Sequence, residues 1–354
     1  MKTSQQKNIS QVENKPAWDE RKIFIDWLTI REENTGQWPE LNDGHVISCD
    51  RNGVEEYTVQ KRLAVKGSHD SSAQVRVTKR ELEISFNPSR FNRNDNLFGC
   101  TYEQAIRKVN NLLYSLGLKP IEKYLLTRVD VTLNVSCGNK AKLDTYIRHL
   151  KKSTLPRKKT YTSYDAAIFQ NKRVKITVYK KHQEIIDNNK IKHDMEDKQA
   201  RNIEQRLRIA RYCEKQGVAR VEVRLGRKAL IDKGLRNGES NNQNSFVKAF
   251  NQEIEKMPKN SAEAITEELT DQELGSLLMW KAGYNPREKI TRQTFYKRRK
   301  AILEKTGFDI GGEMPSKLEQ KNETVKTETT EIPEWYEMPE DEKDPRQKNL
   351  ELVK

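Results

Sequence analysis

Four separate segments of the chain alternate apolar and polar residues with a period of two. They lie at 80–86, 125–135, 173–181 and 219–225, and a β-branched and aromatic stretch, KIFIDWLTI at 22–30, precedes them. Side chains two residues apart in a strand share one face, so each segment presents an apolar face and a polar face. The pattern predicts a sheet whose apolar face is buried beneath helices and whose other face is polar.

Helical periodicity fills the gaps between these segments. Apolar residues recur at helical spacing in 102–118 and 143–152, and the charged stretch 182–215 is typical of one long helix or of two shorter ones. We therefore expect an α+β fold with a mainly antiparallel central sheet and helices on one face.

Composition divides the chain into five parts. Residues 1–20 are polar and patternless, and we expect them to be disordered. A globular domain follows at 21–236, then a polar linker at 237–261, a helical segment at 262–310 and an acidic tail at 311–354. The tail is rich in Glu, Lys, Thr and Pro, so we expect it to be disordered and dispensable for the rest of the chain.

The charge of the chain is strongly basic outside the tail. There are 66 Lys and Arg against 52 Asp and Glu, a net charge of +14. Because the tail holds 7 basic and 12 acidic residues, residues 1–310 carry a net charge of +19. Such a surface attracts polyanions and favours nucleic acid as a partner. A merely basic soluble surface is the alternative, and no basic amphipathic helix stands apart to suggest membrane binding.

The cysteines and the apolar runs indicate the compartment. Cys49, Cys100, Cys137 and Cys213 are widely spaced and form no CxxC pair, so neither a zinc site nor a disulfide framework is expected. No apolar run resembles a signal peptide or reaches the length of a membrane span. We expect a soluble cytoplasmic protein.

The 262–310 segment has the features of two short helices. Thr270 and Glu273 form a capping box, and a second helix at 291–307 carries a cluster of basic residues. We expect this segment to contact DNA in the manner of a helix-turn-helix unit, although a solvated basic helix fits the same pattern. The candidate DNA contacts are Arg292, Lys297, Arg298 and Arg299.

The polar faces of the four strands gather residues that suit phosphoryl chemistry. Carboxylates on three strands, at Glu83, Asp130 and Glu222, are oxygen ligands of the kind that Mg²⁺ or Mn²⁺ prefers. A metal held there would polarise a phosphoryl oxygen. Tyr179 lies on the polar face of its strand as a candidate nucleophile. Its pKa is ordinarily about 10, so attack at neutral pH would need help from Lys181 and the metal.

The same polar faces carry cations that are candidate DNA contacts, Arg128, Arg220 and Arg224. A solvated face with paired cross-strand charges is the alternative for any one strand. Other chemistries lack their motifs, because the sequence contains no GxxxxGK[ST] loop, no GxSxG elbow, no HExxH and no close pair among its five histidines.

The order of these motifs resembles the filamentous-phage gene II/X replication initiator family, which includes plasmid replication proteins. The resemblance spans about residues 22–310 and rests on motifs in a fixed order: FIDWLTI, ELEISFNPSRF followed by DNLFG, TRVDVTLNV, VYKKHQE, GVARVEVRLG and the final QTFYKRRKAILEKTGFDI.

The resemblance implies a nickase-like catalytic domain that cuts one strand of a replication origin. The family leaves a 5′-phosphotyrosine on the protein and a free 3′-OH that primes synthesis. Its nucleophile falls on Tyr179, and the remaining letters of its motif fall on Lys181, His182 and Glu184. Origin DNA, a host helicase and a host polymerase would be the partners in a bacterial cell. A catalytically inert origin-binding or copy-control protein and a conjugative relaxase are the alternatives.

Overall fold

The computed structural model describes residues 22–189, 197–257, 269–306, 310–312, 325 and 327–336. The predicted disorder of residues 1–20 therefore lies outside the described residues. The same holds for the parts of the predicted linker and tail at 258–261, 313–324, 326 and 337–354.

A large sheet forms the centre of the chain, and every neighbouring pair of its strands is antiparallel. Its strand order is β4-β5-β6-β1-β7-β11-β10-β9-β8. The five segments that the sequence predicts as strands are β1 (Phe24–Glu33), β6 (Glu81–Phe86), β7 (Tyr124–Ser136), β10 (Val174–Lys180) and β11 (Val218–Gly226). The remaining strands are β4 (Leu63–Lys66), β5 (Ser72–Val77), β8 (Lys159–Thr162) and β9 (Ala166–Gln170), with β2 (His45–Cys49) and β3 (Glu55–Gln60) in a separate hairpin.

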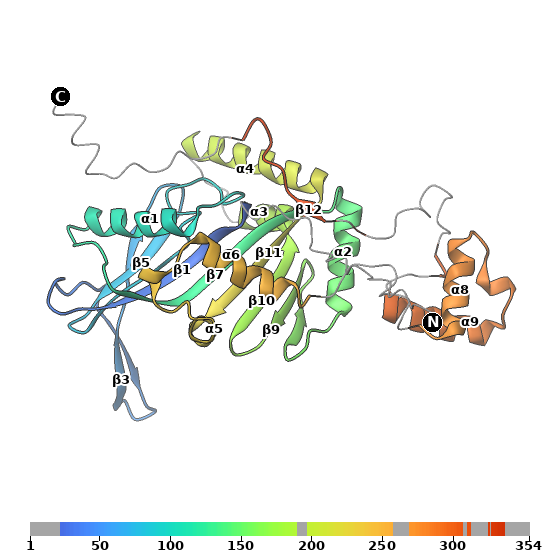
Figure 1. Ribbon diagram of the computed structural model, residues 1–354, viewed down its shortest axis with the longest axis horizontal. Coiled ribbons are helices and arrows are strands. Elements are labelled where there is room, and N and C mark those ends of the chain that lie inside the picture. The colour runs from blue at the N-terminus through green and yellow to red at the C-terminus, as the bar shows by residue number, and fades with distance from the viewer. Residues whose placement is uncertain are drawn as a thin grey trace, which may run out of the picture.

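Helices cover the apolar face of this sheet, as Figure 1 shows. They are α1 (Tyr102–Ser115), α2 (Lys140–Lys152), α5 (Arg227–Asp232) and α6 (Gln243–Ile254). The β-branched residues of the central strands are fully buried against them, including Val131 of β7, Val221 of β11 and Val178 of β10. The α+β fold expected from the alternation is confirmed.

A second helical pair lies at the end of the sheet. Helix α3 (Lys181–Asn189) follows β10 directly and packs against α4 (Asp197–Gln216). A small apolar cluster joins the pair to the loop before α1, with Leu97, Ile185, Ile209 and Cys213 buried in it. The predicted charged helix is therefore two helices.

The C-terminal helices form a core of their own. Helix α8 (Asp271–Lys281) begins at the predicted capping box of Thr270 and Glu273, and α9 (Arg292–Thr306) follows the short turn η3 (Pro286–Glu288). Leu277, Phe295 and Ile302 are buried between them. The two helices that the sequence predicts in this segment are present.

The predicted linker contains a helix of the main body. Residues 243–254 form α6, which begins at a capping box of Asn242 and Ser245 and buries Phe246 and Phe250 in the main core. The run of Asn, Ser and Gln before it suggests a linker by composition, but these residues form η2 (Gly238–Ser240) and the cap of α6. The body therefore extends to Met257, which packs in the same core.

Part of the predicted disordered tail packs on the body. Strand β12 (Glu328–Thr329) pairs with Ser136 and Val135 at the end of β7. Tyr336 is buried beside Phe98, and its hydroxyl donates a hydrogen bond of 2.7 Å to Asp95. Averaged composition hides this docking, because one short strand and the aromatic side chains near 335 anchor an otherwise polar segment.

Among the residues that the structure describes, no helix combines the length and the apolar character that crossing a bilayer requires.

Candidate active site

The polar face of the sheet brings Tyr179 next to a carboxylate. Tyr179 of β10 pairs in register with Arg220 of β11, and Thr177 pairs with Glu222. Tyr179 and Glu222 are thus diagonal neighbours on one face, close enough for side chains to meet. The Tyr179 hydroxyl donates a hydrogen bond of 2.7 Å to Oε1 of Glu222. Alternation predicts both residues on this face, and the structure brings them into contact.

A further carboxylate, Asp26, belongs to this site and was missed in the sequence. Ile25 pairs with Val131 and Trp27 pairs with Asp130, so Asp26 is an extra residue at a register shift between β1 and β7. Strict alternation would place Asp26 with Leu28 in the apolar core. The bulge removes this conflict by turning one residue out of the ladder. The signal for it is the lone acid in the apolar run FIDWLTI.

Amide side chains hold the Asp26 carboxylate in place. Its Oδ1 accepts hydrogen bonds from Asn87 Nδ2 at 2.9 Å and from Asn96 Nδ2 at 2.8 Å. The guanidinium of Arg220 lies 3.8 Å away, between Nη1 and Oδ1. Asp26 is nearly buried, and the fixed amides orient it toward the polar face that carries Glu222.

Asp26 perturbs the ionisation of Glu222. Burial and the nearby Asp26 charge raise the pKa of Glu222 to about 7. Two carboxylates that share a poorly solvated site cannot both ionise easily. Burial and the Glu222 charge also raise the pKa of Tyr179 well above its ordinary value. Tyr179 is therefore a neutral phenol at pH 7, and Glu222 is the acceptor placed to take its proton.

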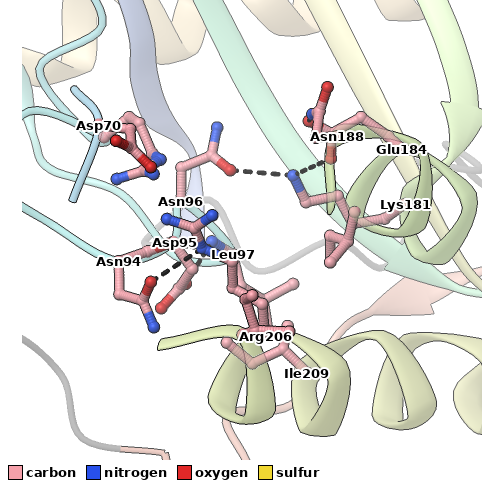
Figure 2. Close-up of a pocket in the computed structure, with 13 residues that line it drawn as sticks. Asp70, Asn94, Asp95, Asn96, Leu97, Lys181, Glu184, Asn188, Arg206 and Ile209 are labelled. Atoms are coloured by element: carbon pink, nitrogen blue, oxygen red, sulfur yellow. Dashed lines mark hydrogen bonds and ion pairs between the residues drawn. The ribbon is translucent and has the colours of Figure 1, made fainter. Parts of the chain in front are cut away.

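The motif residues Lys181 and Glu184 lie beside this pair. The buried Lys181 Nζ donates hydrogen bonds to Asn96 Oδ1 at 2.9 Å and to Glu184 Oε2 at 2.7 Å, as Figure 2 shows. Burial works against the Glu184 charge, but Lys181 and Arg220 outweigh it and lower the pKa of Glu184. Asn96 thus contacts both Lys181 and Asp26 and connects the start of α3 to the acids of the sheet.

The stretch of sequence that forms most of this sheet matches a known protein family. Residues 24–244 match the family model for the N-terminal part of the phage gene II replication-associated protein. The chain belongs to the gene II replication-associated protein family. The matched stretch includes β1, β7, β10 and β11, and the expected resemblance is confirmed. No curated protein and no solved structure matches the chain.

His182 does not share the surroundings of Tyr179 in this gene II family chain. The side chain is buried, and burial lowers its pKa. The charged groups that influence it are Glu214 of α4, Lys140 and Asp144 of α2, and Lys180. Because Lys180 is bound to Asp144 at 2.7 Å, His182 is associated with the α2 side of the sheet. The structure therefore separates His182 from the other predicted catalytic residues.

The predicted metal ligands Glu83 and Asp130 form ion pairs with arginines. Glu83 is fully buried and contacts Arg31 at 2.7 Å, Arg76 at 3.1 Å and also Arg62. Asp130 accepts a two-pronged contact from Arg128, at 2.9 and 2.5 Å, and a third bond from Arg224 at 3.3 Å.

These arrangements bear on the expected metal. Across the described residues there is no group of three or more His, Cys, Asp or Glu that could hold a metal ion, so the predicted trio of Glu83, Asp130 and Glu222 is not assembled. Asp26 and Glu222 fit a cation better, because Mg²⁺ often takes one or two carboxylates together with substrate phosphates. Their mutual repulsion is the kind that a bound cation relieves.

The predicted DNA contacts on the sheet differ in exposure. Arg220 is fully buried, with Nε donating to Asn134 Oδ1 at 3.0 Å and Nη2 donating to the carbonyls of Asn96 and Leu97. It therefore supports the loop at 96–97 and is not placed on the surface. Arg128 lies over the Trp27 ring at 4.7 Å and remains half-exposed, as does Arg224.

The predicted DNA contacts of α9 lie beyond the stretch that the family model matches. Arg298 donates to Ser276 Oγ at 3.1 Å and to Gln272 Oε1 at 2.8 Å, so it links α9 to α8. Arg299 is half-buried, whereas Arg292 and Lys297 are exposed. Of the four predicted contacts on α9, Arg292 and Lys297 are therefore the fully exposed ones.

Proposed function

We propose that this chain is a rolling-circle replication initiator that nicks origin DNA by attack of Tyr179 on a phosphodiester. The hydrogen bond of 2.7 Å from Tyr179 to Glu222 carries the proposal, because it pairs a nucleophile with an acceptor whose pKa is about 7. A general base works best when its pKa lies near the working pH and when it reaches the proton directly. Membership of a replication-associated family supports DNA as the substrate.

The proposed reaction exchanges one ester for another. As the Tyr179 oxygen bonds to phosphorus, its proton passes to Glu222, and the bond from phosphorus to the 3′-oxygen breaks. The 3′-oxygen takes up a proton from water and becomes the primer end. The protein keeps a 5′-phosphotyrosine, which stores the bond for later rejoining without ATP. In the reverse reaction the 3′-hydroxyl bonds to phosphorus and gives its proton to water, the bond from phosphorus to the Tyr179 oxygen breaks, and the protonated Glu222 returns its proton to the phenol.

A divalent cation, Mg²⁺ or Mn²⁺, would be held by Asp26 and Glu222 together with a DNA phosphate. When bound, it would polarise the phosphoryl oxygen and so assist attack. The chain itself orients Asp26 through Asn87 and Asn96. We propose that origin DNA binds along the polar face. In the bacterial cytoplasm a host helicase would separate the strands, and a host polymerase would extend the primed 3′ end.

The proposal is tested by incubating the full chain with supercoiled replicon DNA and Mg²⁺ or Mn²⁺. We expect nicked circles and protein attached to a 5′ end on denaturing gels. Binding to the DNA without either product would favour an inert origin-binding protein instead. Cleavage that leaves no protein on the DNA would point to a hydrolytic nuclease.

A further inference from the structure

A cavity of about 410 Å³ lies beside the predicted catalytic motif. Its walls come from the loop at 94–97 and from helices α3 and α4, with Asp70 at one side (Figure 2), and Arg90 also lines it. The cavity, here called the Arg90 pocket, is lined in part by Arg90, Asn94, Asn96, Lys181 and Arg206. Pockets of roughly 300–1,000 Å³ hold small ligands in proteins, so a single nucleotide fits this space.

Two guanidinium groups lie close enough in this pocket to affect each other's ionisation. Burial and the nearby Arg206 charge lower the pKa of Arg90 to about 10. Burial also lowers the pKa of Arg206. Like charges in a poorly solvated site destabilise each other. Asp70 and Asp95 counter part of this effect on both arginines, and a further anion between the two guanidinium groups would stabilise them more.

Arg90 also has an unused donor. Its Nη2 donates a hydrogen bond of 2.6 Å to the carbonyl of His69, whereas Nη1 is buried and has no hydrogen-bond partner among the described residues. Leaving a buried donor unsatisfied costs free energy. The planar guanidinium is the side chain best suited to phosphate oxygens.

Two of the acids that line the pocket, Glu184 and Asp95, already accept hydrogen bonds from other groups. Glu184 accepts from Lys181 at 2.7 Å and from Asn188 at 2.8 Å. Asp95 accepts from the Leu97 backbone at 2.8 Å and from the Tyr336 hydroxyl. Their charges are therefore partly offset within the protein, and they do not use the Arg90 donor.

The rim of the pocket contains unusual backbone. His69 and Asp70 lie consecutively in the left-handed region, with φ of +56° and +58°. Asn92, itself at φ +60°, accepts a hydrogen bond from the Ser68 amide at 2.9 Å and helps to hold this loop. Strained residues of this kind cluster at ligand sites, where the surrounding structure maintains them.

The Arg90 pocket is joined to the Tyr179 site by one side chain. Asn96 contacts Lys181 in the pocket wall and Asp26 on the sheet. We propose that the Arg90 pocket binds the phosphate of a single-stranded DNA nucleotide adjacent to the one that Tyr179 attacks. The position of that nucleotide rests on the proposed function, whereas the phosphate-binding pocket itself does not.

The pocket is tested with thymidine 3′,5′-bisphosphate as the probe and thymidine as its uncharged counterpart. Binding to the full chain is measured by calorimetry for the parent, Arg90→Gln and the exposed control Arg51→Gln. We expect the bisphosphate to bind the parent and the control alike, and thymidine to bind much more weakly. Arg90→Gln should weaken bisphosphate binding about tenfold or more, because a charged hydrogen bond is lost. Equal binding by parent and Arg90→Gln would overturn the proposal, as would no binding by the parent.

A second variant protects the test against misfolding. Arg90→Lys keeps the positive charge but lacks the forked donors, so we expect intermediate binding with a melting temperature close to that of the parent. If Arg90→Gln melts far lower, Arg90→Lys takes its place in the comparison. Binding by Arg90→Lys at full parental affinity would then count against the pocket.

The position next to the cut is tested separately, once the nick has been mapped. Oligonucleotides with a single uncharged methylphosphonate on either side of the nick are bound to the uncleaving Tyr179→Phe chain, with and without Arg90→Gln. We expect one methylphosphonate to weaken binding when Arg90 is present and to have no effect in the Arg90→Gln chain. If the loss of affinity caused by each methylphosphonate simply adds to the loss caused by Arg90→Gln, the assignment is overturned. If the chain nicks no DNA yet binds the bisphosphate through Arg90, the proposed function fails and the pocket stands.

Discussion

The Tyr179 hydroxyl lies 2.7 Å from Oε1 of Glu222, on an adjacent antiparallel strand. If Glu222 accepts the phenol proton, Glu222→Gln should lower the rate of covalent adduct formation by about 10²–10⁴-fold while DNA binding persists. The rate is measured by trapping protein on a labelled origin strand. Glu204→Gln, at an exposed position of α4, is the matched control and should keep the parental rate. An undiminished rate in Glu222→Gln would show that Glu222 does not accept the Tyr179 proton.

The pH dependence of cleavage follows from the raised pKa of Glu222. A base must lose its proton before it can act, so the cleavage rate should rise with pH, and a bound cation should bring its midpoint below the value of about 7 that Glu222 has without one. Asp26→Asn removes a charge that raises this pKa, so in the absence of divalent cations the Glu222 carboxyl should titrate at lower pH in this variant. The rate of Asp26→Asn should also respond less to added Mg²⁺. Identical pH profiles of the parent and Asp26→Asn would show that Asp26 does not affect the pKa of Glu222.

The same pKa predicts a pH dependence of stability. Because the folded pKa of Glu222 lies above its ordinary value, the folded chain holds this proton more tightly than the unfolded chain. The resulting stabilisation is complete below the ordinary pKa of about 4.5 and is lost as pH rises through about 7. In denaturant titrations between pH 5 and 8, the parent should therefore lose more stability than Glu222→Gln. Parallel curves would indicate an unperturbed carboxyl.

Arg220 is expected to stabilise the loop that carries Asn96. Arg220→Met leaves the Asn96 and Leu97 carbonyls without their buried donor and Asp26 without its nearby cation. Removing one partner of a buried charge pair typically costs about 3–5 kcal/mol. Arg224→Met, on the same strand but half-exposed, should cost about 1 kcal/mol or less. Equal losses in the unfolding free energy would show that Arg220 has no special structural role.

The docked part of the tail should contribute to stability. Tyr336→Ala empties a buried aromatic site beside Phe98, a change that costs about 3 kcal/mol in comparable cores. Truncation after residue 336 should leave the melting temperature unchanged, whereas truncation before residue 327 should lower it. Identical melting temperatures for the two truncations would restore the sequence-based view that the whole tail is dispensable.

The sheet was predictable because alternation reports local geometry. Val131, Val178 and Val221 all lie on the buried face that a period of two assigns to them. The contact between Tyr179 and Glu222 follows from the same pattern once the strands are neighbours. Strand order itself depends on distant pairing, which the pattern in a single strand does not contain.

The missed residues have identifiable physical causes. Asp26 reaches the polar face through a bulge, and one inserted residue reverses the face that alternation assigns. Glu83 accepts bonds from Arg31 and Arg76 on neighbouring strands, and this pairing depends on which strands are adjacent. Asp130 is bound by Arg128 of its own strand, a pairing that residue type alone did not reveal. Tyr336 docks through contacts to residues more than 200 positions away, which local composition cannot reveal.

The identity of the nucleophile is tested most directly by mapping the peptide that remains attached to DNA after cleavage. Tyr161 and Tyr164 lie upstream and are exposed, so they are the natural alternatives and the matched controls. We expect the label on Tyr179 alone. Tyr179→Phe should bind DNA and yield no adduct, while Tyr161→Phe and Tyr164→Phe should retain it. A label on any tyrosine other than Tyr179, or an adduct formed by Tyr179→Phe, would contradict the proposed site.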